Sequence, residues 1–389
     1  MRIGLFSDSY KPYVSGVVNS IDIFTRELRL LGHEVYIFAP RYPNYQDEEP
    51  GIFRFSSVQA PTNRDFSVAI PFSLEFAPVL RKLDLDLIHV HSPFILGQVG
   101  AVQARRLNIP LIFTYHTLYE QYVHYVPFSQ NLTREFVVRL SRYFCNRCDL
   151  VITPTGKVKE LLNDYGVLAP IEVIPTGIDL ARFSCGDQEW LRRRLKIDPQ
   201  EKILLFVGRL TKEKNVDFLI RAFGLTQSRF PRTRLVIVAG GPEEEKLKRL
   251  TEELGLTERI DFLGRMAEQD LVNCYHGADF FVFPSVTETQ GLVILEAMAA
   301  GLPVIAVDAF GVSDMINSGI DGLLTKYTLA DFTDGICLLL KDEQQRGAIA
   351  KAARTKAINL SSSQMGLRLE AAYLRVLEKR WRYPQKITG

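Results

Sequence analysis

Arg209 and Lys214 stand together in the segment VGRLTKEKN, residues 207–215, directly after an apolar run that is typical of a buried strand. An apolar pattern with helical spacing comes next. Arginine offers a planar fork of donors and lysine a compact charge, a pair suited to the two phosphates of a diphosphate. The spacing favours an anion site at the end of a strand, and it leaves open the ordinary alternative of a solvated charged loop.

Two carboxylates flank a predicted helix start in the segment PSVTETQGLVILEAMAAG, residues 284–301. Glu288 precedes the helix, Gly291 lies at the junction, and Glu296 lies about one turn inside the helix. The free N–H groups and the dipole of a helix N-terminus attract anions, and glycine lets the backbone come close to a ligand. Glu296 stands among apolar residues, where a carboxylate needs a partner. We therefore predict a bound phosphate, with carboxylates that accept hydrogen bonds from sugar hydroxyls on either side.

Two loops in the first half of the chain are further candidates. Residues 9–19 place Gly16 at a predicted helix start, and they lack the G-x-G-x-x-G spacing of an NAD-binding fold. His116 directly follows a predicted strand. The side chains that come after it are mostly aromatic: Tyr119, Tyr122, His124 and Tyr125. This cluster suggests an acceptor pocket with an apolar part, while an ordinary loop and a structural histidine remain the alternatives.

Three other patterns are interpreted as structural. Asp84 and Asp86 have the D-x-D spacing of metal-dependent sugar transferases, but they precede a predicted strand instead of following one. The pair Cys145 and Cys148 has no second C-x-x-C to complete a metal site. His89 and His91 alternate with apolar residues, and one of them is predicted to lie in the core. We expect no metal and no cofactor.

The elements that position these residues repeat the order strand, loop, helix. Short apolar runs with little alternation indicate parallel strands covered on both faces. They lie at residues 2–6, 35–39, 87–91, 111–115, 150–153 and 171–174, and again at 203–207, 235–239, 260–263, 280–284, 303–307 and 322–324. The second series restarts the design of the first, so the predicted fold is α/β, with two doubly wound, Rossmann-like domains that face a central cleft.

The domain boundary is placed at residues 175–183, which carry Pro175 and Gly177 and no strong periodicity. This gives an N-terminal domain of residues 1–178 and a C-terminal domain of residues 179–365. The last segment, residues 366–389, is helical in pattern and is expected to pack back on one of them, with the first domain as our choice. Because ligands bind beyond the carboxyl ends of parallel strands, the site is predicted between the two domains.

Composition limits the class of protein. The 389 residues are 47% hydrophobic and 24% charged, values typical of globular chains and not of disordered or coiled-coil ones. A net charge of +2 argues against a nucleic-acid binder. Five cysteines, with no stretch that fits a signal peptide or a membrane span, predict a cytoplasmic protein that touches a membrane only at its surface.

With these residues in this order, the chain resembles the retaining glycosyltransferases of family four, which have the GT-B fold. The likeness covers nearly the full length, and its most specific part is Glu288 and Glu296 together with Arg209 and Lys214. It implies that the second domain holds a nucleotide sugar. Arg209 and Lys214 would bind the diphosphate, Glu296 the ribose hydroxyls and Glu288 the sugar ring.

The resemblance also implies a wider site. Backbone N–H groups would come from Thr289, Gln290, Gly291 and Leu292, and the base would lie against Arg265 and Met266. From the first domain, Gly16 would approach the phosphate and His116 the transferred sugar. The implied catalytic residues are His116, Arg209, Lys214 and Glu288.

Within the family, the resemblance is greatest to bacterial 1,2-diacylglycerol 3-glucosyltransferases. It implies transfer of glucose from UDP-glucose to diacylglycerol at the inner face of the membrane, with the acceptor bound by Tyr119, Tyr122, His124 and Tyr125. Two departures are Asp314, where many relatives have glutamate, and Ser15, where many have a second glycine. A soluble sugar or a phosphoinositide as acceptor, a sugar-nucleotide epimerase or hydrolase, and a non-catalytic binding module remain the alternatives.

Residues 129–160 carry six basic and three acidic side chains. Apolar side chains repeat every four residues in the same stretch: Leu132, Phe136, Leu140 and Phe144. A basic amphipathic helix of this kind lies well on anionic lipid, and the alternative is a helix that packs on the core with a solvated face. The basic and aromatic segment 379–383 is a second possible lipid contact.

Overall fold

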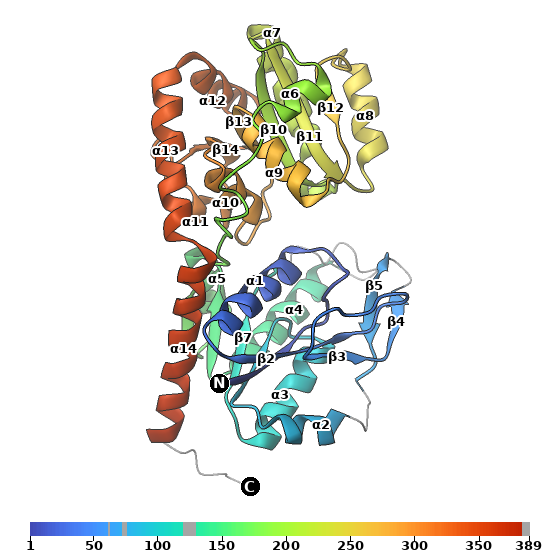
Figure 1. Ribbon diagram of the computed structural model, residues 1–389, viewed down its shortest axis with the longest axis vertical. Coiled ribbons are helices and arrows are strands. Elements are labelled where there is room, and N and C mark those ends of the chain that lie inside the picture. Colours follow the sequence, from blue (N-terminus) through green and yellow to red (C-terminus); the bar gives the residue numbers. More distant parts are fainter. Residues whose placement is uncertain (61–62, 72–75, 120–129, 383–389) are drawn as a thin grey trace. The chain divides into compact units, whose positions relative to one another are not determined.

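The computed structural model describes residues 1–60, 63–71, 76–119 and 130–382. The chain divides into two compact units, Met1–Gly177 with Ser362–Gly389, and Ile178–Ser361. Each unit is built on a parallel sheet flanked by helices (Figure 1). The fold class predicted from the sequence, α/β with two doubly wound parallel sheets, is confirmed.

The first unit holds a seven-stranded sheet of order β3-β2-β1-β6-β7-β8-β9, in which all pairs are parallel. Its strands are β1 (Arg2–Phe6), β2 (Glu34–Pro40), β3 (Ile52–Phe55), β6 (Leu87–Val90), β7 (Leu111–Thr114), β8 (Leu150–Thr153) and β9 (Ile171–Val173). The strand order reverses between β1 and β6, and ligands of such sheets bind at that switch point. A separate antiparallel hairpin, β4 (Ser57–Ala60) with β5 (Asn63–Ala69), and strand β3 were not predicted from the sequence.

Six helices of this unit are described: α1 (Gly16–Leu30), α2 (Phe76–Leu83), α3 (Ile95–Leu107), α4 (Gln130–Cys145), α5 (Gly156–Asp164) and α14 (Ser362–Arg382). The terminal helix α14 packs along α1 (Figure 1). The two helices approach closely at Gly366, where a Cβ atom would lie 2.7 Å from the Cβ of Glu27. Glu27 also accepts a hydrogen bond of 2.6 Å from the Ser362 hydroxyl.

The second unit holds a six-stranded parallel sheet of order β12-β11-β10-β13-β14-β15. Its strands are β10 (Lys202–Arg209), β11 (Thr233–Gly240), β12 (Ile260–Phe262), β13 (Phe280–Phe283), β14 (Val304–Val307) and β15 (Leu323–Thr325). Its helices are α6 (Trp190–Leu195), η3 (Lys212–Lys214, 3₁₀), α7 (Val216–Arg229), α8 (Glu244–Glu253), α9 (Glu268–Gly277), α10 (Leu292–Ala299), α11 (Val312–Met315), α12 (Leu329–Lys341) and α13 (Glu343–Asn359). Its switch point lies between β10 and β13.

The central strands β6, β7, β8, β13 and β14 are buried along their whole length. All four residues of β13 are at most 1% exposed, which explains the uninterrupted apolar run. Strand β10 is longer than the sequence indicated, since Gly208 and Arg209 were predicted to lie in a loop. They remain in the strand because they continue its pairing with Ala239 and Gly240 of β11.

Candidate active site

An ion pair joins the loops that follow the two strands at the switch point of the second unit. Lys214 Nζ, in η3 after β10, contacts Glu288 Oε1, in the loop after β13. The two side chains are only 19% and 16% exposed, and the Ser285 hydroxyl lies 3.1 Å from the same carboxylate oxygen. Lys214 Nζ also lies 5.9 Å from the centre of the Phe283 ring. The structure therefore brings two of the predicted site residues into direct contact.

Arg209 ends β10 and is exposed to solvent. Within the described residues, no hydrogen bond or ion pair joins it to Lys214 or to Glu288. The two cations therefore differ in state: Lys214 is held by a carboxylate, while the Arg209 guanidinium remains open to an incoming anion. Guanidinium groups hold phosphate through two parallel hydrogen bonds, which suits Arg209 to a diphosphate.

The loop that carries Glu288 is fixed by its neighbours. Gly311 N–H donates a hydrogen bond of 3.0 Å to the Glu288 carbonyl oxygen. The Asn215 side-chain amide donates one of 3.3 Å to the carbonyl of Pro284, which links this loop to the one after β10. A Cβ atom at position 311 would lie 2.2 Å from the Thr289 carbonyl oxygen and 2.5 Å from that of Glu288. Only glycine lets these backbones approach so closely.

We expect Gly311→Ala to lower catalytic activity more than it lowers stability. The added methyl group must push the Thr289 and Glu288 backbone aside, and such overpacking costs about 1–3 kcal/mol. The displacement moves the Glu288 carboxylate, so kcat falls while the protein still folds. Thermal melting and steady-state kinetics check this, with Gly347→Ala as control because a Cβ atom there meets nothing within 4 Å. Wild-type kcat in Gly311→Ala would contradict the fixed position of the loop.

Helix α10 begins directly after Gly291, whose φ of 75° lies in the left-handed region that favours glycine. Its predicted start at Gly291 or Leu292 is therefore correct. The first N–H groups of any helix have no partner within the helix, so this end can meet an anion. Gln290, just before it, is buried, while Leu292 is half-buried.

Glu296 accepts a hydrogen bond of 2.7 Å from the hydroxyl of Tyr275, which lies on α9. Burial raises the pKa of the Glu296 carboxyl, and both this hydrogen bond and the nearby charge of Arg182 oppose the rise. The sequence indicated that Glu296 needs a partner but did not identify Tyr275, because only the fold brings α9 against α10. Burial likewise raises the pKa of the Tyr275 hydroxyl, which stays protonated as the donor.

Arg265 and Met266 follow β12 and lie at the same edge of the sheet as Arg209. The Arg265 side chain covers Gly240, since a Cβ atom there would lie 3.2 Å from its Cγ. Gly240 in turn pairs with Arg209. Met266 is half-buried against the core of the unit. Arg265 is therefore close to the end of β10, and the prediction that the base lies against Arg265 and Met266 stays a prediction.

In the first unit, Gly16 is the first residue of α1, after the capping residue Ser15. The Ser15 hydroxyl accepts a hydrogen bond of 3.3 Å from Val18 N–H, which gives this serine a structural role at the start of the helix. A Cβ atom at Gly16 would meet nothing within 4 Å. Packing therefore does not require glycine at position 16, and the space above it is open.

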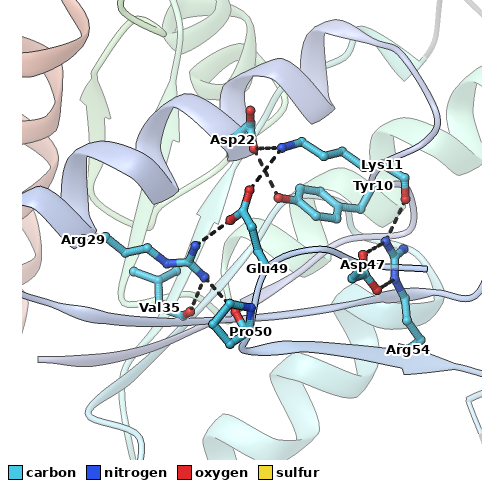
Figure 2. A network of polar contacts seen from close by, with 9 residues as sticks. All are labelled: Tyr10, Lys11, Asp22, Arg29, Val35, Asp47, Glu49, Pro50 and Arg54. Carbon is cyan, nitrogen blue, oxygen red and sulfur yellow. Dashed lines mark hydrogen bonds and ion pairs between the residues drawn. The ribbon is translucent and has the colours of Figure 1, made fainter. Parts of the chain in front are cut away.

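A network of ion pairs holds the loop that leads to Gly16 (Figure 2). Lys11 Nζ lies 2.5 Å from Asp22 of α1 and 3.7 Å from Glu49, and Arg29 lies 2.7 Å from Glu49. Arg54 donates a hydrogen bond of 2.7 Å to the Lys11 carbonyl oxygen. Both ends of Lys11, its side chain and its backbone, are thus fixed.

His116 follows β7 as predicted, and its Nε2 lies 2.9 Å from Nδ1 of His91. Burial lowers the pKa of His116 to about 3, so the ring is neutral at physiological pH. His89 and His91 are each 1% exposed, so the prediction that one of them lies in the core was too cautious. His89 lies in β6 and His91 directly follows it, and the two buried rings pack together with their centres 4.3 Å apart.

Of the predicted acceptor residues, Tyr119 is described and the other three are not. The Tyr119 ring meets the rings of Phe94 and Tyr115 edge to face, with centres 5.0 and 5.4 Å away. These contacts make an aromatic cluster of residues on either side of His116 in the sequence. Tyr122, His124 and Tyr125 lie outside the described residues.

The patterns interpreted as structural have structural partners. Asp86 accepts a hydrogen bond of 2.6 Å from the backbone of Arg2, and Asp84 pairs with the Arg2 side chain at 2.8 Å. Cys145 and Cys148 are buried free thiols. In the part of the chain that the structure describes, no three His, Cys, Asp or Glu side chains are grouped to hold a metal ion.

Two family models match the chain, one on each unit. The model described as Glycosyltransferase Family 4 covers residues 14–182, and Glycosyl transferases group 1 covers residues 187–356. An alpha-monoglucosyldiacylglycerol synthase of Streptococcus pneumoniae is 35% identical over 96% of this chain and 86% of its own length. The chain is a family-four glycosyltransferase. The predicted family and the predicted activity, retaining transfer of a hexose, are confirmed.

A second similar protein is the alpha-monoglucosyldiacylglycerol synthase of Acholeplasma laidlawii, 32% identical over 78% of this glycosyltransferase and 80% of the relative. Among solved structures, HepE of Anabaena in complex with UDP-glucose matches with a TM-score of 0.77. The match covers 96% of this chain and all of that chain at 20% identity. At that identity it shows the fold, which is GT-B.

Proposed function

We propose that this glycosyltransferase moves glucose from UDP-glucose to diacylglycerol at an anionic membrane surface, with retention at the anomeric carbon. The observation that carries the proposal is the similarity to two relatives whose names state that they make a monoglucosyldiacylglycerol, over most of the chain and of both relatives. The solved structure of HepE with UDP-glucose supports the choice of donor. The proposal assigns the donor to the second unit and the acceptor to the first.

Cleavage of the bond between the anomeric carbon and the diphosphate is the difficult step. Negative charge grows on the leaving phosphate as positive charge grows on the sugar. Fixed cations and N–H dipoles stabilise that phosphate more in the transition state than in the ground state. In the proposed site these are Arg209, Lys214 and the start of α10 after Gly291. The ion pair with Glu288 holds Lys214 in place, and the proposal assigns that carboxylate to the sugar ring.

Retention is proposed to occur by attack on the same face that the diphosphate leaves. Glu288 is engaged by Lys214 and Ser285, and the chain offers no second carboxylate in contact with it among the described residues. The departing phosphate then accepts the proton of the acceptor hydroxyl as the new glycosidic bond forms. We propose that His116 approaches the transferred sugar, and its lowered pKa makes it too weak a base to compete for that proton.

Helix α4 supports the choice of a membrane surface. Phe144 and Ser141 are buried, whereas Phe136 is 65% exposed and Tyr143 is 61% exposed. On an α-helix, side chains four residues apart differ in direction by about 40°. Phe136 and Phe144 are two such steps apart, so they do not share the single apolar face that the spacing had indicated. Phe136 and Tyr143, seven residues apart, do share one, with exposed Arg139 beside them. Two exposed aromatic rings with arginines suit an anionic interface.

No helix in the described residues is long and apolar enough to cross a membrane. Attachment through α4 would therefore be peripheral.

We expect the double variant Phe136→Ser and Tyr143→Ser to bind anionic vesicles about tenfold or more weakly, because each ring buried in the interface contributes roughly 1.5–3 kcal/mol at most. Co-sedimentation with anionic vesicles measures this loss of binding. Ile320→Ser, which removes an exposed apolar side chain from the second unit, is the matched control. Equal binding by the double variant and the control would exclude α4 as the attachment site.

The proposed function is tested by incubating the protein with UDP-glucose, with and without diacylglycerol vesicles that contain anionic lipid. We expect a glucolipid only with diacylglycerol, and an α-linkage by NMR of the product. Parallel reactions with GDP-mannose and with soluble sugar or phosphoinositide acceptors identify a different substrate. Consumption of donor without any acceptor would indicate a hydrolase or an epimerase. Absence of glucolipid under every condition would refute the lipid acceptor.

A further inference from the structure

Three histidine rings stand in a row inside the first unit. His89 lies in β6, His91 directly follows that strand, and His116 follows the neighbouring strand β7. The ring centres of His89 and His91 are 4.3 Å apart, and those of His91 and His116 are 5.2 Å apart. Burial lowers the pKa of all three, to about 3 for His89 and for His116. Each neutral ring carries only one N–H group. The hydrogen bonds between the rings therefore determine which nitrogen of each ring is protonated.

One unpaired nitrogen, Nε2 of His91, indicates which nitrogen of each ring is protonated. Nδ1 of His91 lies 2.9 Å from Nε2 of His116, whereas the buried Nε2 of His91 has no hydrogen-bond partner among the described residues. A buried N–H group without a partner is rarer than an unfilled acceptor. The hydrogen of His91 is therefore on Nδ1, and His91 donates it to Nε2 of His116. His116 must then carry its own hydrogen on Nδ1.

We propose that His91 is a positioning residue that fixes His116 as the Nδ1–H tautomer, so that His116 meets the substrate as a hydrogen-bond donor and not as a base. The lone pair of His116 Nε2 is occupied by the His91 hydrogen, and its other nitrogen is protonated. Contact between His116 and the transferred sugar rests on the proposed function. The tautomer itself rests only on the geometry of the first unit.

His89 keeps His91 in this orientation. Its Nδ1 lies 2.6 Å from the Tyr373 hydroxyl, and its Nε2 lies 2.7 Å from the Thr114 hydroxyl. With both nitrogens bonded, the His89 ring cannot turn without losing a hydrogen bond, and it packs against the ring of His91. Tyr373 belongs to α14 and Thr114 to β7, so three elements hold the row. The orientation of the His116 ring thus depends on α14.

Nitrogen-15 NMR of the full-length protein labelled at histidine tests the tautomer. The two nitrogens of a neutral ring have distinct shifts according to which is protonated, and the His116 signals are assigned by their loss in His116→Gln. We expect His116 to be protonated at Nδ1 and unprotonated at Nε2 at neutral pH, and His91 likewise. A His116 ring protonated at Nε2 would overturn the proposal.

Two substitutions at His91 separate positioning from packing. In His91→Asn the side-chain amide can still donate at the position of Nδ1, whereas His91→Leu fills the space without a donor. We expect kcat for glucose transfer to fall about five- to tenfold in His91→Leu, the loss expected for one hydrogen bond, with little change in KM. The NMR signals of His116 should then show a mixture of tautomers. His91→Asn should keep most of the kcat and the Nδ1–H form.

His33→Gln is the control, because His33 lies in the same unit and bonds to Glu370 instead of to this row. Unchanged kcat and an unchanged His116 tautomer in His91→Leu would overturn the positioning role. If His91→Leu does not fold, the wild-type spectrum and His91→Asn still decide the question. Failure of the wild-type protein to form glucolipid would refute the proposed function alone, since the NMR result does not depend on activity.

Discussion

Lys214→Ala should lower kcat for glucose transfer by about a hundredfold or more, as the loss of one preorganised electrostatic group does in other enzymes. Lys214 is expected to stabilise the charge that develops on the leaving diphosphate, and its removal also leaves the half-buried Glu288 carboxylate without its cation. Arg209→Ala should give a similar loss, because the open guanidinium is expected to hold the same diphosphate. Steady-state kinetics with UDP-glucose measure both.

Lys212→Ala is the matched control for these variants. Lys212 lies on the same 3₁₀ turn and has the same charge, but it is exposed. We expect its kcat to stay close to that of the wild type. If Arg209→Ala and Lys214→Ala also retain nearly full turnover, neither cation stabilises the leaving group. If Lys212→Ala loses as much as they do, the effect comes from the net charge of the loop and not from the two assigned residues.

Glu296→Gln should raise KM for UDP-glucose by about tenfold to a hundredfold, because hydrogen bonds to a charged carboxylate are roughly twice as strong as those to a neutral amide. The ribose lies away from the reacting bond, so kcat should change little. The pKa of the Glu296 carboxyl is raised in the folded protein, which means that its ionised form opposes folding at neutral pH. We therefore expect the melting temperature of Glu296→Gln to equal or exceed that of the wild type.

Acidification should imitate this substitution. As pH falls through the raised pKa of Glu296, the carboxylate is protonated and donor affinity is lost, at a pH above that of an ordinary glutamate. Tyr275→Phe removes the hydrogen bond that favours the ionised form, so the loss should move to still higher pH. The dependence of KM on pH in the two proteins measures the shift. A KM of Glu296→Gln equal to that of the wild type would place the ribose elsewhere.

The sequence predicted most of the second unit because its patterns are local. The run before Arg209 and the apolar residues of 280–283 indicate buried parallel strands, and the carboxyl ends of such strands meet at one edge. Gly291 indicates a helix start through its own backbone preference. Strand β3 and the hairpin of β4 and β5 escaped notice because polar residues interrupt their sequences, IFRF, SVQA and NRDFSVA, so none of them has a continuous apolar run.

The predictions that failed concern contacts between distant segments. Spacing by four residues suggested one apolar face on α4, but the packing of Phe144 into the core leaves Phe136 outside. The alternation at His89 and His91 indicated one buried ring, and the structure buries both, with Tyr373 of α14 as a partner of His89 and His116 as a partner of His91. Tyr275 was missed because nothing in the sequence near it indicates a carboxylate partner.

The two parallel sheets and the residue types at the ends of their strands could be predicted from the sequence, because hydrophobic periodicity and backbone preferences act between residues close in the chain. The family was indicated by the resemblance of its motifs. The tertiary structure alone decided that Lys214 pairs with Glu288, that Tyr275 bonds to Glu296, and that His91 meets His116. Each of these contacts joins separate elements, and hydrogen bonds require distances near 3 Å that only the packed fold can set.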